Sequence, residues 1–273
     1  MNLQEDSGGN RQVTESAGYI LKSWRRQRRY SQLKLALELD ISSKHISFIE
    51  TGKSIPSKEM ILKIGEFLFI PKREVNRILL SAGHAPVYSE LPISDAALKP
   101  VTSAISQMIE NHMPYPAIVL NQAWDIVKVN DSASRLLSEL GFSGHKNLLE
   151  AIIQEHPGSS KILNFHQTAT VILLRLRQEI SMLGDPGYLK AFERRLKERL
   201  FKDKEIVDLP EPEDGIVLST KFQLSNHSLS FFSIIAQLGT VQDVVVSEFK
   251  VELMFPADEK TKEFYSVAHK KSV

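Results

Sequence analysis

Cysteine is absent from this sequence of 273 residues. Its absence excludes disulfides, thiolate zinc sites and cysteine nucleophiles, so any chemistry has to come from other side chains. A run of about 18 apolar residues, the length needed to span a bilayer, is also missing. The first residues, MNLQEDSGGNRQVTES, lack the basic-then-apolar order of a signal peptide. We therefore expect a cytoplasmic protein without a membrane partner.

Sequence motifs of enzymes are missing as well. The chain contains no Gly-rich phosphate loop, no G-x-S-x-G motif and no spacing of histidines or carboxylates that is typical of a metal site. We therefore predict that the protein is not an enzyme and that it has neither catalytic residues nor a metal.

The sequence does contain an uneven distribution of charge. The net charge is only +1, but residues 11–85 hold 14 Lys and Arg against 7 Asp and Glu, whereas the remainder holds 20 against 26. The length is comfortable for two domains of about 100 to 200 residues. A basic segment followed by a mildly acidic one indicates a nucleic-acid-binding domain followed by a domain with another task.

The basic segment has the pattern of five short amphipathic helices. Residues typical of helix starts are Ser31, Ser42 or Ser43, Ser57 and Pro71, and Gly52 and Gly83 are typical of helix ends. Because each helix is short, the five must stabilise one another as one all-α domain, which we place at residues 10–85. The apolar residues that recur at helical spacing and should form its core are Ala17, Ile20, Leu21, Trp24, Leu35, Ala36, Leu39, Ile46, Ile49, Ile61, Ile64, Leu68, Val75, Ile78 and Leu79.

The second and third of these helices, joined by a short turn, have the helix-turn-helix order. If Ile46 and Ile49 face the core, the other side of the third helix can offer donors and acceptors to base edges in the major groove. Phe48 can contact a thymine methyl group there, unless it is a core residue at the helix end. The candidates for base contacts are Ser43, Lys44, His45, Ser47 and Phe48, and those for phosphate contacts are Lys53, Ser54 and either Arg25 or Arg28.

The stretch SQLKLALELDISSKHISFIETGKSIPS resembles the helix-turn-helix of the Xre/Cro/lambda-repressor family. It has that family's Ser-Gln at the start of the second helix, Leu-Ala within it, Ile-Ser in the third helix, and then Ile-Glu-x-Gly-Lys and Pro-Ser. The resemblance implies a five-helix lambda-repressor-like domain in which Gln32 contacts a phosphate and the third helix reads bases. It also implies that Glu50 pairs with Arg25 as an internal brace. RNA binding and protein contact are the rival roles for such a domain.

After a connector at residues 84–94, the pattern changes to a mixture of strands and helices. This order is typical of a PAS-type domain, an α+β fold with one five-stranded antiparallel sheet and helices on one face, which we place at residues 95–265. In the last strand, alternation predicts that Val245, Phe249, Val251 and Leu253 face the helices and that Val244, Val246, Glu248, Lys250 and Glu252 face away. The expected strands are 117–120, 124–130, 215–224, 228–238 and 241–255, and the expected helices are 97–113, 131–140, 148–154, 168–180 and one after Pro186.

The stretches REVNRILLSAGHAPVYSE, PYPAIVLNQAWDIVKVN and LSFFSIIAQLGTVQDVVVSEFKVELMFPADE resemble bacterial regulators in which an Xre-type domain precedes an MmyB-like ligand-binding domain. Together with the first domain, the resemblance spans about residues 15–265. It implies a PAS-like sensor that binds a small apolar, fatty-acid-like molecule and controls the DNA-binding domain. One departure is Asn164-Phe165, where relatives tend to carry Asn-Trp.

Six residues are candidates for the lining of a ligand pocket: Trp124, Phe165, His166, Arg175, Phe231 and Phe232. The aromatic side chains have plain core packing as an alternative. His166 has no second histidine three or four residues away, so a structural histidine is the alternative there. Arg175 and Arg177 stand in an otherwise apolar helix, and one of them could hold a carboxylate through two parallel hydrogen bonds.

Together these features predict a sequence-specific transcription regulator whose third helix reads double-stranded DNA. Because one such domain contacts only a half-site, we expect a homodimer on a palindromic operator with half-sites about 34 Å apart. Two alternatives remain open. The second domain could serve only for dimerisation, or the protein could be an adaptor that uses its first domain for protein contacts.

Overall fold

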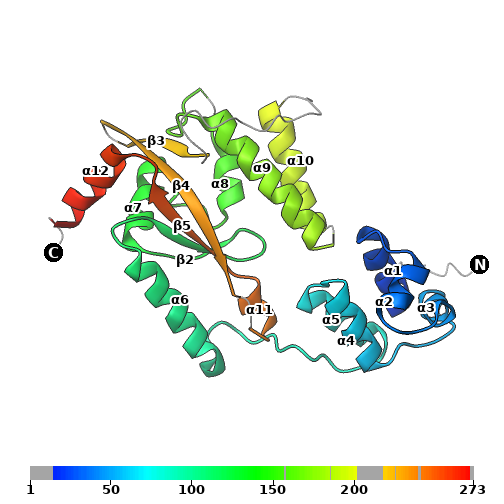
Figure 1. Ribbon diagram of the computed structural model, residues 1–273. Coiled ribbons are helices and arrows are strands. Elements are labelled where there is room, and N and C mark those ends of the chain that lie inside the picture. The colour runs from blue at the N-terminus through cyan, green and yellow to red at the C-terminus, as the bar shows by residue number, and fades with distance from the viewer. Residues whose placement is uncertain are drawn as a thin grey trace, which may run out of the picture. The chain divides into compact units, whose positions relative to one another are not determined.

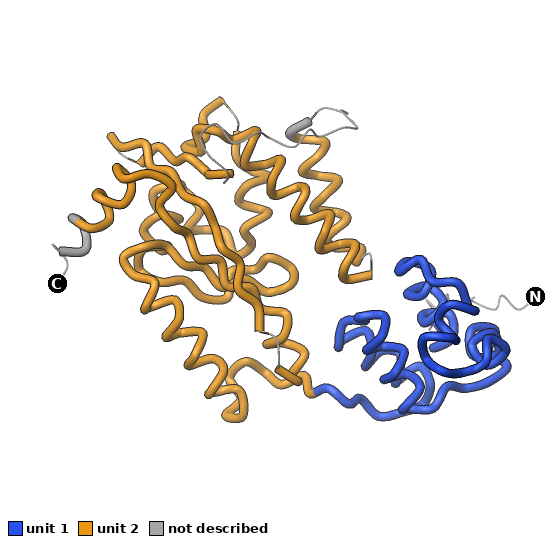
Figure 2. The backbone as a smooth tube through the Cα atoms, viewed as in Figure 1, with its two compact units in different colours: residues 1–88 blue, residues 89–273 orange. Residues whose placement is uncertain are grey.

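The computed structural model describes residues 15–156, 158–184, 186–201, 218–224, 226–238 and 241–270. The chain divides into two compact units, residues 1–88 and residues 89–273 (Figure 2). Residues 10–14 of the expected first domain and residues 215–217 of an expected strand lie outside the described residues. Within the described ranges, no helix has the length and apolar character that a membrane span requires.

The first unit contains five helices: α1 (Ala17–Gln27), α2 (Gln32–Glu38), α3 (Ser43–Glu50), α4 (Lys58–Phe67) and α5 (Lys72–Ser81). Each of the first four begins after a serine whose hydroxyl accepts a hydrogen bond from an amide of the first turn, namely Ser16, Ser31, Ser42 and Ser57. All fifteen residues that the sequence placed inward belong to one buried core. The predicted five-helix domain is therefore confirmed.

α1 and α3 approach each other closely at Gly18. A Cβ atom added at Gly18 would lie 2.0 Å from the carbonyl oxygen of Ile49. No side chain fits at that distance, so glycine allows the backbone of α1 to pack directly on α3. This contact fixes the position of α3, whose opposite side is the predicted DNA-reading face.

The second unit is built on a five-stranded antiparallel sheet in the order β2-β1-β5-β4-β3 (Figure 1). The strands are β1 (Ala117–Leu120), β2 (Ile126–Val129), β3 (Thr220–Leu224), β4 (His227–Gln237) and β5 (Lys250–Pro256). β5, the last strand in the chain, pairs with both β1 and β4 and so lies at the centre of the sheet. The α+β class and the five-stranded antiparallel sheet are as the sequence predicts.

Helices cover both faces of this sheet. On one face, α6 (Lys99–Asn111), which follows the short 3-10 helix η1 (Ala96–Leu98), shares a small buried cluster with β1, β5 and α11 (Val244–Ser247). On the other face lies a larger core, to which α7 (Asp131–Leu140), α8 (Leu148–Gln154), α9 (Phe165–Met182), α10 (Gly187–Phe201) and α12 (Glu259–Lys270) contribute. Figure 1 shows α6 on one side of the sheet and α8, α9 and α10 on the opposite side.

Two predicted details of the sheet are wrong. Val244–Ser247, expected within the last strand, form α11 instead. The carboxylate of Asp243 caps this helix, Val244 and Val246 are completely buried, and Val246 lies in the small cluster. Three successive valines favour a strand, but the cap and the burial outweigh that propensity. The expectation of a single covered face also fails, since all four residues of β1 are buried.

Candidate functional sites

The outer face of α3 carries the residues that the sequence assigned to base contacts. Ile46 and Ile49 are buried, whereas Ser43 and Lys44 are exposed and His45 and Ser47 are half-buried. Ser42 acts as the N-cap, since its hydroxyl accepts a hydrogen bond from the amide of His45 at 3.1 Å. The polar side chains of α3 are thus presented outward on a helix that its own core residues and cap hold in place.

Phe48 lies on this outer face and not in the core of the unit. Its side chain is 36% exposed. The ammonium groups of Lys44 and Lys53 lie 5.5 and 5.7 Å from the centre of its ring, within cation–π range. The loop after α3 returns to this helix, because the amides of Lys53 and Ser54 both donate to the carbonyl of Phe48. Phe48 therefore links the helix face to the lysine of the loop.

A buried ion pair lies behind α3. Nε and Nη2 of Arg25 donate to the two carboxylate oxygens of Glu50 at 2.5 and 2.8 Å, and Nη1 donates to the carbonyl of Tyr30. Gln32 adds a hydrogen bond to Glu50 at 2.8 Å. Burial alone would raise the pKa of Glu50, but the hydrogen bonds from Arg25 and Gln32 outweigh it and hold this pKa below its usual value. We call this pair the Arg25–Glu50 brace.

The brace corrects part of the predicted phosphate-contact set. Arg25 is buried and all three of its guanidinium nitrogens are used within the unit, so the structure supports its role as a brace and not as a DNA contact. Arg28 donates from Nε to the carbonyl of Leu68 at 3.0 Å and lies over the ring of Trp24. Its guanidinium therefore holds the end of α4, and the phosphate contact of Arg28 stays a prediction.

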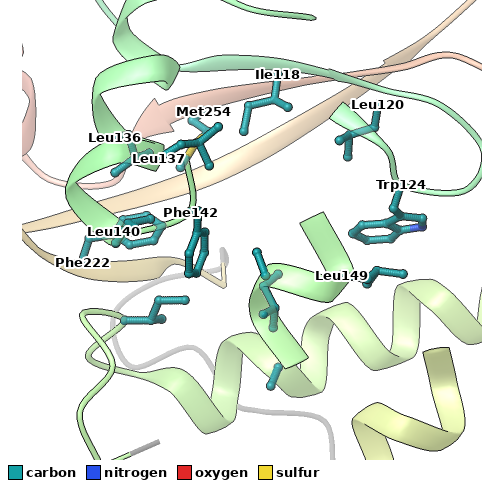
Figure 3. Close-up of a cluster of buried hydrophobic side chains, with 14 of the residues drawn as sticks. Ile118, Leu120, Trp124, Leu136, Leu137, Leu140, Phe142, Leu149, Phe222 and Met254 are labelled. Atoms are coloured by element: carbon teal, nitrogen blue, oxygen red, sulfur yellow. The ribbon is translucent and has the colours of Figure 1, made fainter. Parts of the chain in front are cut away.

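The second candidate site is a group of charged side chains around the ring of Trp124, on the α9 side of the sheet. We call it the Trp124 cluster; its members are Trp124, Arg175, Glu179, Lys250 and Glu252. Figure 3 shows Trp124 within the larger core, near Leu120 and Leu149. The site thus combines charged groups with the apolar interior of the unit.

Glu179 is the acceptor at the centre of the Trp124 cluster. Its carboxylate accepts hydrogen bonds from the indole Nε1 of Trp124 at 2.7 Å, from Nζ of Lys250 at 2.7 Å and from Nε of Arg175 at 3.2 Å. The guanidinium of Arg175 lies 4.3 Å and the ammonium of Lys250 lies 4.6 Å from the centre of the Trp124 ring. Two cations therefore share one carboxylate and one aromatic ring.

One hydrogen-bond donor in the Trp124 cluster has no acceptor. Nη1 of Arg175 donates to Glu252 at 3.1 Å, but Nη2 of Arg175 is buried without a hydrogen-bond partner. Within the part of the chain that the structure describes, it is the only buried side-chain nitrogen or oxygen atom in this state. Leaving a buried charged donor unpaired is costly, so this atom indicates a position suited to one further acceptor.

Lys250 and Trp124 are both under constraint in this cluster. Burial lowers the pKa of Lys250 below its ordinary value, although the charge of Glu179 opposes that change. Trp124 has a φ angle of 68°, a conformation that is unfavourable for a bulky residue. The backbone carbonyl of Trp124 accepts a hydrogen bond from Leu148, which helps to hold this conformation. Strain of this kind often accompanies functional sites.

The structure does not bring all predicted pocket residues together. Trp124 and Arg175 meet in the cluster, and Phe165 and Phe231 lie in the larger core. His166 is exposed on α9, and within the described ranges no group of three or more His, Asp or Glu side chains could hold a metal ion. Phe232 stacks on Phe255, and as the neighbour of Phe231 in β4 it points to the other face of the sheet.

Sequence reasoning missed three members of the Trp124 cluster: Glu179, Lys250 and Glu252. Alternation did place Lys250 and Glu252 on one side of the last strand, but the expectation that this side faces away from the helices is wrong, because α9 covers it. The available signal was the spacing of Arg175 and Glu179, which puts both on the same side of α9. Arg177, the other arginine considered, pairs with Glu193 of α10 instead.

Comparisons with known families agree with this division of the chain. A family model described as "MmyB-like transcription regulator ligand binding domain" matches residues 101–266. A second model, described as "Helix-turn-helix", matches residues 21–75. No curated protein matches the sequence at a significant level. The first match contains the whole Trp124 cluster, and the second contains α2 and α3.

Proposed function

The chain belongs to the family of MmyB-like transcription regulator ligand-binding domains, and from this premise we propose that it is a DNA-binding transcription regulator controlled by a small anionic, largely apolar ligand. α3 reads the major groove, and the Trp124 cluster receives the ligand. Such a role on genomic DNA places the protein in the cytoplasm. Both matched models describe binding modules, and we propose no chemical reaction for the chain.

The DNA-reading role is supported by the outward polar face of α3. Ser43, Lys44 and Ser47 offer donors and acceptors to base edges, and Phe48 offers an apolar surface to a thymine methyl group. Lys53 and Ser54 supply phosphate contacts that add affinity without sequence preference. One such helix reads only a half-site, so we propose a homodimer on a palindromic operator with half-sites about 34 Å apart.

The ligand-binding role is supported by one observation above all, the buried and unpaired Nη2 of Arg175. A carboxylate that takes the place of Glu252 at Nη1 and also reaches Nη2 would receive two parallel hydrogen bonds, the preferred geometry for arginine. Glu252 would keep its hydrogen bond from Ser233. The Trp124 cluster adjoins the larger apolar core, so the apolar tail of a fatty-acid-like ligand matches the character of the neighbouring residues.

Genomic footprinting tests the DNA-reading role. The double variant Lys44→Ala, Ser47→Ala should lose specific sites while it keeps weak binding at low salt, because phosphate contacts remain. The matched control is Arg77→Ala, Ser81→Ala on α5, which also removes one positive charge and one hydroxyl. Equal occupancy of all sites by both variants and the wild type would refute readout by α3 and favour an adaptor.

Mass spectrometry tests the ligand-binding role. The full-length protein should retain a carboxylic acid during purification or bind added dodecanoate. A protein that neither carries nor binds such a molecule would refute the sensor role. If this protein still sediments as a dimer, its second unit would be a dimerisation domain only.

A further inference from the structure

The connector between the two units is held at the end of the first unit by Asn76 of α5. The side-chain oxygen of Asn76 accepts hydrogen bonds from the amides of Val87 and Tyr88 at 3.0 and 3.1 Å. Its side-chain nitrogen donates to the carbonyl of Tyr88 at 2.8 Å. Asn76 is buried, and the ring of Tyr88 packs against the core of the first unit. Residues 87 and 88 are therefore fixed to α5.

The very next residues of the connector are held by the second unit, through Asp243. The carboxylate of Asp243 accepts hydrogen bonds from the hydroxyl of Ser89 at 2.9 Å and from the amide of Leu91 at 3.0 Å. The amide of Val244 donates to the carbonyl of Ser89 at 2.8 Å. Asp243 is buried. That burial would raise its pKa, but the hydrogen bonds from Leu91 and Ser89 outweigh it and hold the pKa below its usual value. We call this set of contacts the Asp243 clasp.

The Asp243 clasp is continuous with the Trp124 cluster through a short stretch of chain. Asp243 caps α11, which ends at Ser247, and Lys250 is the first residue of β5. Between them, Val246 and Phe249 are buried in the small cluster against which Leu91 of the connector packs. Tightly packed residues therefore connect Lys250 with the chain that leads to the first unit.

We infer that the Asp243 clasp is the output of the sensor: a ligand that rearranges the Trp124 cluster moves α11 and opens the contacts of Asp243 with Ser89 and Leu91. This inference rests on the proposed function, because it concerns the control exerted by the same ligand. With the clasp closed, the first unit holds Tyr88 and the second unit holds the next residue, Ser89, so no free residue lies between the two. With it open, the connector gains free residues.

Free residues in the connector change how a dimer binds an operator. Two DNA-reading units that are held by short tethers act at a high effective concentration on half-sites of one spacing. Longer and more flexible tethers lower that effective concentration and allow a wider range of spacings. Opening of the clasp therefore weakens binding to a two-half-site operator but leaves binding to a single half-site unchanged.

Three variants of the full-length protein test this inference. Ser89→Ala removes one hydrogen bond to the clasp carboxylate, and Asp243→Asn removes its charge. The matched control is Asp258→Asn, because Asp258 accepts hydrogen bonds from the amides of Thr261 and Lys262 near the start of α12 and makes no hydrogen bond to the connector among the described residues. Ser89 is exposed, so Ser89→Ala keeps the test valid if Asp243→Asn does not fold.

Hydrogen exchange and DNA binding are the two measurements. Amides of the connector around residues 89–91 should exchange about tenfold faster in both clasp variants than in the control, as expected for the loss of a hydrogen bond to a charged group. Dodecanoate should accelerate the same amides in the wild type. On an operator obtained by selection from random DNA, both clasp variants should bind about tenfold more weakly than the wild type. Both clasp variants should still bind dodecanoate, but dodecanoate should change their affinity for the operator only a little.

The outcomes separate this inference from the proposed function. Suppose that connector amides exchange faster in the clasp variants, but dodecanoate still changes their operator affinity as it does in the wild type. The clasp is then not the output of the sensor, and the ligand-controlled function stands. Dodecanoate that binds the wild type without any change in connector exchange also overturns the clasp. If dodecanoate does not bind at all, the proposed ligand is wrong. If, in addition, the clasp variants bind the operator as tightly as the wild type does, the role of the clasp is overturned as well.

Discussion

Each of the two units contains an arginine paired with glutamate, buried in the first unit and half-buried in the second, and the two arginines differ in how their donors are satisfied. In the Arg25–Glu50 brace, all three nitrogens of Arg25 donate to acceptors of the same unit. In the Trp124 cluster, Nη2 of Arg175 has no acceptor. A buried ion pair stabilises a fold only when its remaining donors are satisfied. Every guanidinium nitrogen of Arg25 therefore has an acceptor within its own unit, whereas Arg175 can still donate to one further acceptor in the Trp124 cluster.

The titratable groups of the two sites show the same contrast. In the brace, hydrogen bonds outweigh burial and lower the pKa of Glu50, so the charged form is favoured. In the Trp124 cluster, burial outweighs the attraction of Glu179 and lowers the pKa of Lys250, so the charged form is disfavoured. A charged group whose burial is unfavourable is easier to rearrange when a ligand offers it better hydrogen-bond partners.

Removal of the carboxylate from the brace should give the largest effect. Glu50→Ala leaves Arg25 buried without its partner, which should lower the free energy of unfolding of the first unit by about 3–5 kcal/mol. Urea unfolding followed by the fluorescence of Trp24, in a Trp124→Phe background, measures this. The control Glu38→Ala removes an exposed glutamate of α2 and should change stability by less than about 0.5 kcal/mol. Similar effects for both variants would contradict the brace.

Removal of the arginine from the Trp124 cluster should have a smaller effect on stability and a specific effect on binding. In Arg175→Met, Glu179 keeps its bonds from Lys250 and Trp124, so we expect a loss of only about 1–2 kcal/mol. Binding of dodecanoate, measured by calorimetry, should weaken about tenfold or more because its carboxylate loses a bidentate partner.

The matched control for this variant is Arg177→Met, which lies on the same helix and pairs with Glu193. It should keep the affinity of the wild type for dodecanoate. Equal losses of affinity in both variants would indicate damage to α9 as a whole and would remove the distinction between the two arginines.

The helices and core of the first unit were predictable because their signals are local. Serine caps, terminal glycines and apolar residues at helical spacing occur within a few residues of one another, and they specified α1 to α5 and the core. In the second unit, three valines read as a strand, and only long-range burial and the Asp243 cap make them helical. The pairing of Arg175 with Glu252 could not be predicted, since Glu252 lies 77 residues away in the sequence.

Gln32 tests how far the brace extends. Its side-chain nitrogen donates to Glu50, whereas the family resemblance assigns it to a phosphate. Gln32→Ala should lower the free energy of unfolding of the first unit by about 1 kcal/mol, the contribution of a single hydrogen bond. Because glutamine is uncharged, the dependence of DNA affinity on salt concentration should not change. A loss of affinity without any loss of stability would assign Gln32 to DNA contact alone.

The pH dependence of stability should give the smallest effect, and it isolates the cost of burying Lys250. Because the pKa of Lys250 is lowered on folding, the unfolded chain binds more protons than the folded unit at pH values between that lowered pKa and 10.5. The free energy of unfolding therefore rises with pH in this window, by at most about 1.4 kcal/mol per pH unit.

Lys250→Met lacks this proton equilibrium, so the stability of the wild type relative to Lys250→Met should increase as the pH rises through the same window. Urea unfolding of both proteins at several alkaline pH values measures the difference. The control Lys146→Met removes an exposed lysine and should show no such trend. A flat difference for Lys250→Met would mean that Glu179 fully compensates the buried charge. The Trp124 cluster would then resemble the brace in its energetics, and Arg175 alone would distinguish the two sites.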